Sequence, residues 1–176
     1  MLPGDEHIAN PIGSLQHAVT IRGPRQAVWP WLAQMGAGSR AGWYSYDRLD
    51  NGGRPSAIAV VPELQDLTAG MIFPAAPGAT DAFTLLAFER NRFLVLGWLG
   101  PDGIPRMTWA FVLEDAGRGS TRLLVRVRAA PGYRVLGLPW PLARPIIASV
   151  HHVMQRRQLH GIARRAEQGV RVARAA

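Results

Sequence analysis

Four apolar, β-rich runs lie close together in the middle of the chain, and they constrain its fold more than any other feature. They cover residues 83–88, 93–98, 107–113 and 121–129. Connections this short join antiparallel neighbours, because parallel strands need a longer crossover. In the last run, apolar side chains alternate with arginines, which predicts one face in the core and one in solvent. The apolar residues are Leu123, Val125, Val127 and Ala129, and the arginines are Arg122, Arg126 and Arg128.

Helical patterns flank these runs. The first is predicted from Pro24, since Val28, Trp31, Leu32 and Met35 follow the i, i+3, i+4, i+7 spacing of one buried face. A short strand over residues 17–22 precedes it. A long C-terminal helix is expected to open at Pro145 and end near Gly169. Strands grouped between two helices predict an α+β fold, with helices on one face of an antiparallel sheet. The apolar stripe of the last helix is predicted to be Ile146, Val150, Val153, Met154 and Ile162.

Length and composition indicate one domain. The 176 residues are 48% hydrophobic, which is enough for a packed core. We expect an irregular arm over 1–14, a single domain over 15–169 and a frayed basic tail over 170–176. Cysteine is absent, which excludes disulfides, thiolate metal sites and cysteine nucleophiles, and lysine is absent too. The start has no secretory signal and no stretch is apolar enough to span a bilayer, so a cytoplasmic protein without a transmembrane segment is expected.

The charge is unevenly distributed. Residues 1–117 carry a net charge of −3, whereas residues 118–176 carry +11. Such a basic half can attract acidic partners, but a solvated strand face and helix face are the favoured explanation. RNA-binding sheets interleave basic residues with exposed rings, and the arginine face of the last strand has none. We therefore expect no nucleic acid partner.

A dense group of rings occupies residues 29–51. It contains three of the six tryptophans and two of the three tyrosines, next to acidic and amide side chains. Buried Trp N–H and Tyr O–H groups need polar partners, so this block is more specified than ordinary core. Trp43, Tyr44 and Tyr46 could line a pocket with Asp47 and Arg54 as polar anchors. The same residues could instead brace a loop on the sheet, and the pattern leaves both interpretations open.

Other candidates lie on the predicted strands and last helix. Trp98 and Trp109 could form the floor of a cavity or belong to ordinary core. On the helix, Val150, His151 and Met154 are placed to face the sheet, and a neutral His151 could act as a general base. The helical histidines lack the i, i+4 spacing of a metal site, so no metal is expected. No phosphate-binding or dinucleotide-binding motif is present, and we expect no cofactor.

The order of elements and several segments resemble the SRPBCC superfamily, which includes START lipid-transfer domains, birch-pollen-allergen-like proteins and polyketide cyclases. The segments are PRQAVWPWLAQMG, GWYSYDRLDN with RPSA and PELQDL, TWAFVLE with TRLLVRVR, and RRQLHGIARRAE. The middle and later segments resemble a bacterial branch of unknown function. The resemblance covers roughly residues 15–168 and implies a helix-grip fold, in which a curved antiparallel sheet wraps around a long C-terminal helix over an apolar cavity.

Three functions are compatible with this interpretation, because such cavities serve carriers, receptors and enzymes. The first is binding of an apolar or aromatic small molecule between the sheet and the last helix. The second is a cofactor-free enzyme of the cyclase or dehydrase kind, with a Tyr, Asp or His moving protons. The third is a basic interaction module for an acidic partner. The sequence leaves open whether any reaction is catalysed, and it does not indicate an oligomeric state.

Overall fold

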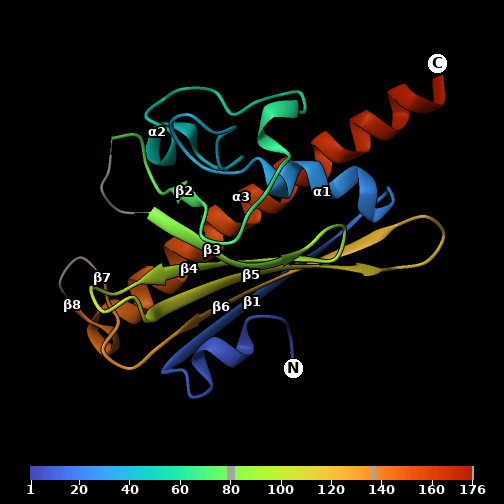
Figure 1. The fold of residues 1–176 in the computed structure, drawn as a ribbon. Coiled ribbons are helices and arrows are strands. Elements are labelled where there is room, and N and C mark those ends of the chain that lie inside the picture. Colours follow the sequence, from blue (N-terminus) through green and yellow to red (C-terminus); the bar gives the residue numbers. More distant parts are fainter. Residues whose placement is uncertain (79–81, 136–137, 176) are drawn as a thin grey trace.

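An open antiparallel sheet forms the centre of the molecule. The computed structural model describes residues 1–78, 82–135 and 138–175. Within these ranges six strands lie in the spatial order β1-β6-β5-β4-β3-β2, and each neighbouring pair is antiparallel (Figure 1). The predicted α+β class is therefore confirmed, as are the four central strands. The bounds are β1 Gly13–Ile21, β2 Ile72–Pro74, β3 Ala82–Glu89, β4 Phe93–Leu99, β5 Pro105–Asp115 and β6 Thr121–Ala129.

Two helices cover one face of this sheet. The helix α1 (Arg25–Ala33) follows Pro24 as predicted, and α3 (Trp140–Ala175) runs the length of the sheet beside it (Figure 1). Large apolar side chains from the strands and both helices form the core between these layers. Small elements complete the chain: the turns η1 (Asp5–Ile8), α2 (Asp47–Asp50) and η2 (Pro62–Leu64), and the hairpin strands β7 (Arg134–Val135) and β8 (Leu138–Pro139).

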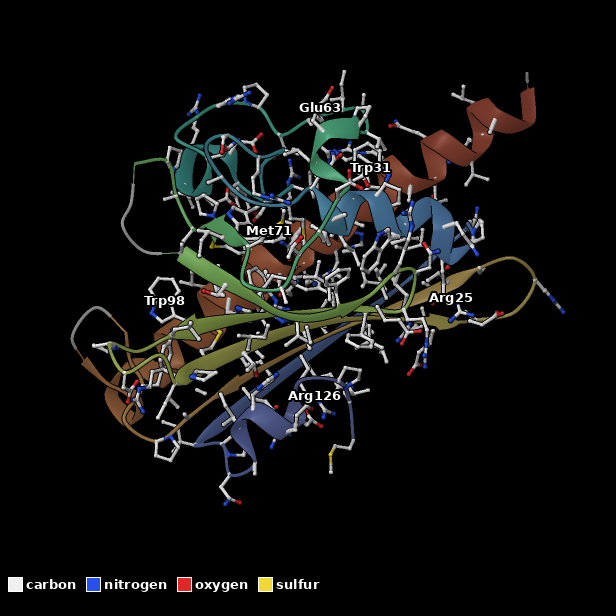
Figure 2. The ribbon with its side chains drawn as sticks, viewed as in Figure 1. Arg25, Trp31, Glu63, Met71, Trp98 and Arg126 are labelled. Atoms are coloured by element: carbon white, nitrogen blue, oxygen red, sulfur yellow. The ribbon has the colours of Figure 1, made fainter. Side chains whose placement is uncertain are left out.

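The opposite face of the sheet is not simply solvated, which corrects the expectation for the last strand. The turn η1 lies against this face, and Asp5 forms ion pairs with Arg126 (2.7 Å) and Arg128 (2.8 Å) of β6. Figure 2 shows Arg126 on the side where η1 lies. Residues 1–14 are thus not an irregular arm: they contain this 3₁₀ turn, and β1 begins at Gly13. The turn packs against the sheet because the two arginines pair with the Asp5 carboxylate, which is only 6% exposed.

The long helix differs from its prediction at both ends. It begins at Trp140, five residues before Pro145, and continues to Ala175, so the expected frayed tail is helical. A proline removes one backbone hydrogen bond and a helical glycine costs about 1 kcal/mol, but neither ends a helix of 36 residues that packs on a sheet. The buried face of the helix also differs from the predicted apolar stripe, because Val150 and Val153 are each 52% exposed. The side chain of Ile146 lies outside the described residues.

Candidate functional site: a cavity between the sheet and the long helix

A cavity of about 180 Å³ lies between the sheet, α3 and the loop that carries α2. Its walls are mostly apolar, with a few polar groups from α3 and α2. Small-molecule sites have this composition, although they are usually larger than about 300 Å³. The lining residues are Trp43, Ser45, Asp50, Ala75, Phe83, Trp109, His151, Met154, Gln155 and Gln158.

Three rings form the apolar wall. Trp43 stacks on Trp109 with ring centroids 5.4 Å apart and planes 21° from parallel, and Phe83 lies against both rings. Trp43 is 3% exposed, and its indole N–H donates to the carbonyl oxygen of Pro74 (3.2 Å). The loop tryptophan and the strand tryptophan, 66 positions apart in the sequence, are thus held as one surface.

One face of α3 forms the polar wall. His151, Met154, Gln155 and Gln158 follow the i, i+3, i+4, i+7 spacing that places side chains on one side of a helix. The indole N–H of Trp109 donates to Oε1 of Gln155 (3.0 Å), and Nε2 of Gln155 donates to Oε1 of Gln158 (2.7 Å). Both glutamines are 2% exposed. This chain of hydrogen bonds fixes the side chains of helix and sheet relative to each other.

His151 presents a ring nitrogen without a partner. Its Nε2 atom is buried and forms no hydrogen bond in the described part of the chain. Burial, helped by the positive fields of His17 and His152, lowers the pKa of His151 to about 4. His17 of β1 lies 5.6 Å from the His151 ring and 5.2 Å from the His152 ring. The imidazole that lines the cavity is therefore neutral at pH 7 and can accept or donate one proton there.

Asp50 brings a buried carboxylate to the cavity. It is the last residue of α2 and is 8% exposed. Burial and the nearby Asp47 carboxylate raise the pKa of Asp50 to about 6. The Ser45 hydroxyl and the N–H groups of Tyr46 and Asp50 lower this pKa somewhat. Across the described residues, however, neither oxygen receives a hydrogen bond of good geometry. An acid in this state is costly to the fold and is a marker of functional sites.

Tyr44 and Asp47, expected at the pocket, instead brace the loop. Tyr44 is 3% exposed and has a left-handed backbone (φ 61°), which is unusual for a bulky residue. Its N–H donates to Ser56 Oγ (3.1 Å), and the Ser56 hydroxyl donates to Asp47 (2.5 Å). Arg165 of α3 lies over the Tyr44 ring at 4.7 Å. Both interpretations of the ring cluster therefore apply, to different residues: Trp43 lines the cavity, and Tyr44 holds the loop that positions it.

The other four predicted site residues lie away from the cavity. Tyr46 is 40% exposed beside Arg157, and Arg54 donates to the Gly38 carbonyl at the surface. Trp98 contacts Phe83 edge-on from outside the lining, and Val150 points to solvent. Four of the ten predicted residues thus line the cavity: Trp43, Trp109, His151 and Met154.

Apart from His151, sequence reasoning missed the polar groups of the site. Gln155 and Gln158 share a helical face with Met154 and Ile162, and two amides on an apolar face were the available signal. Asp50 sits in the polar stretch DRLDN and gave no sign of burial. His17 lies over 130 residues before His151, so only the topology brings the two together.

Two further observations bear on the kind of site. Within the described ranges, no group of three or more His, Cys, Asp or Glu side chains is arranged to hold a metal ion. In the same ranges, no helix combines the length and the apolar character needed to cross a bilayer.

A curved sheet that grips a long C-terminal helix over a cavity defines the helix-grip class, and this chain has that fold. The comparisons agree. A Zhui aromatase/cyclase from Streptomyces sp. R1128 matches over 92% of this chain and 97% of its own, with a TM-score of 0.55 and 16% identity. A protein from Nitrosospira multiformis matches over 90% and 99%, with a TM-score of 0.55 and 11% identity. No family model and no curated protein sequence matches the chain. The helix-grip fold that the sequence resemblance implies is therefore confirmed.

Proposed function

We propose that this chain binds a small apolar or aromatic molecule in the cavity between the sheet and α3. The observation that carries the proposal is the lining itself, in which stacked rings face a buried imidazole nitrogen and a buried carboxylate that lack partners among the described residues. Apolar walls supply affinity, and a few fixed polar groups supply orientation. A volume of about 180 Å³ suits a one-ring compound, since a cavity of about 150 Å³ holds benzene.

Two measurements test this function. Native mass spectrometry of freshly purified protein is expected to reveal a co-purified molecule that is released on denaturation. Titration calorimetry with 2-phenylethanol as probe is expected to give saturable binding with one site per chain. A protein that carries no molecule and takes up no probe would contradict the proposal.

Two variants on α3 test whether the probe binds in the cavity. Met154→Phe adds volume to the lining and is expected to abolish probe binding. Val153→Phe is the matched control, because the adjacent side chain is 52% exposed and its enlargement leaves the cavity unchanged. Equal affinity in both variants would exclude the cavity as the binding site.

A second candidate function is general acid–base catalysis in the same cavity. It is favoured by one observation: a neutral imidazole and a carboxyl group with a pKa of about 6 line the same cavity. His151 keeps the general-base role expected of it from the sequence, and Asp50 supplies the carboxyl group. His151→Gln and Asp50→Asn are expected to lower turnover of a polyketone substrate at least 100-fold while leaving its binding intact. Unchanged turnover in both variants would rule this function out.

A further inference from the structure

The least satisfied group in the cavity is the Asp50 carboxylate. More than nine-tenths of the residue is buried, and neither oxygen accepts a hydrogen bond of good geometry from the described residues. A buried carboxylate without well-aligned donors is costly to a fold. A positively charged partner from outside the chain would offset that cost.

The surroundings of Asp50 do not supply a positive charge. The charged side chain that affects its pKa is Asp47, which is also negative. No arginine is among the described residues that line the cavity, and the chain contains no lysine. The other titratable lining group, His151, is neutral at pH 7 because burial and its two histidine neighbours disfavour its charged form. The cavity therefore carries one uncompensated negative charge.

The rest of the lining suits a cation as well. Trp43, Phe83 and Trp109 line the cavity with aromatic rings, whose quadrupoles attract positive charge. An ammonium group has three N–H donors, so one nitrogen can serve both carboxylate oxygens. A hydroxyl group has one donor and no charge. The ring surface and the carboxylate together select for an aromatic compound with a cationic nitrogen.

We infer that the molecule bound in this cavity is a small aromatic amine, whose ring lies against Trp43 and Trp109 and whose protonated nitrogen pairs with Asp50. The inference rests on the proposed binding function and narrows its ligand class. His151 Nε2 then remains available for a second polar group on the ring.

Three phenylalkyl probes test the charge preference by calorimetry at pH 7.5: the isosteric pair 2-phenylethylamine and 2-phenylethanol, and the carboxylate phenylacetate. Wild-type protein is expected to bind the amine at least 10-fold more tightly than the alcohol, and the carboxylate at least 10-fold more weakly than the alcohol. In Asp50→Asn, which keeps the side-chain shape, the affinities for amine and alcohol are expected to become equal. Retained binding of the alcohol shows that this variant is folded.

The control is Asp66→Asn, which removes the same charge from an exposed loop and is expected to keep the full preference for the amine. Equal binding of amine and alcohol by the wild type, or an amine preference that survives in Asp50→Asn, would overturn the inference. If alcohol and amine bind equally and Met154→Phe abolishes both, the proposed function stands and the amine class is wrong. If no probe binds, both fail.

Discussion

Gly161 of α3 lies directly against the backbone of Tyr44. A Cβ atom at position 161 would overlap the Tyr44 carbonyl oxygen and lie 3.0 Å from the Tyr44 Cβ. The glycine thus lets the loop approach the helix closely, and Tyr44 adopts its left-handed backbone at this contact. The position of Trp43 in the cavity wall depends on this approach, because Trp43 immediately precedes Tyr44 in the chain.

Gly161→Ala is expected to lower the free energy of unfolding by about 1–3 kcal/mol, since the backbone of Tyr44 must move away from the helix. Gly169→Ala in the same helix is the matched control. Beyond the backbone of the helix itself, no atom of the described residues lies within 4 Å of the added methyl group, so this change is expected to stabilise the protein by about 0.5–1 kcal/mol. Urea unfolding of both variants measures the difference. A neutral or stabilising Gly161→Ala would show that the loop contact is not tight.

Gln155→Leu is expected to destabilise the protein by about 1–3 kcal/mol, because the Trp109 indole N–H and the Gln158 amide lose their partner inside the core. Gln168→Leu, at an exposed position of the same helix, is expected to change stability by less than about 0.5 kcal/mol. In a Trp109→Phe background, the cost of Gln155→Leu is expected to fall. Additive costs in this double-mutant cycle would mean that the hydrogen bond contributes nothing.

Asp50 and His151 are expected to make opposite contributions to stability as the pH falls. The pKa of Asp50 is raised from 3.8 to about 6, so the folded state binds a proton first and gains stability between pH 6 and 4. The pKa of His151 is lowered from 6.5 to about 4, so the unfolded state binds a proton first and the fold loses stability over nearly the same range. The two contributions largely cancel in the wild type.

Single variants separate these contributions. Asp50→Asn is expected to be more stable than the wild type at pH 7.5 by an amount of order 1 kcal/mol, and this advantage shrinks to zero by pH 4. His151→Gln is expected to show the reverse, with an advantage that grows as the pH falls from 6.5 to 4. Urea unfolding at half-unit pH steps measures both trends. Parallel pH dependences would contradict the assignment.

Asp5→Asn tests the contact behind the sheet. Although burial opposes ionisation, hydrogen bonds from Arg128, the Leu2 N–H and Arg126 lower the pKa of Asp5 to about 2. A depressed carboxyl pKa adds stability that is complete above pH 4 and is lost as the pH falls toward 2. We expect Asp5→Asn to cost about 2 kcal/mol at pH 7 and to remove the stability change between pH 4 and 2. Asp102→Asn, an exposed ion pair with Arg106, is expected to cost less than about 1 kcal/mol.

The strands were the most predictable part of the chain, because alternation in one strand is a local signal. The last run, 121–129, was predicted with the bounds that the structure has. The start of α3 differs from its prediction. Pro145 is a typical first residue of a helix, but here the helix begins at Trp140 and continues through it. The buried face of α3 also differs from its prediction. Val150 and Val153 continue the apolar spacing in the sequence, but both side chains are exposed.

The site was harder to predict than the fold, for a physical reason. Its apolar members, such as Trp109 and Met154, follow from hydrophobic patterning. Its polar members are buried only because distant segments meet, as β1 and α3 do at His17 and His151. Asp50 is the extreme case, since its short helix begins in a polar loop and its last side chain turns inward. No local pattern encodes that turn.

The pairing of β1 with β6 determines the order in which this molecule can be assembled. Gly13 is opposite Ala129, so the first strand has no neighbour until more than a hundred further residues have been synthesised. The hairpins from β3 to β6 can form earlier from nearby segments, whereas closure by β1 and docking of α3 come last. The first strand therefore stays unpaired until β6 has been made. The cavity forms only when α3, which supplies one of its walls, has docked on the sheet.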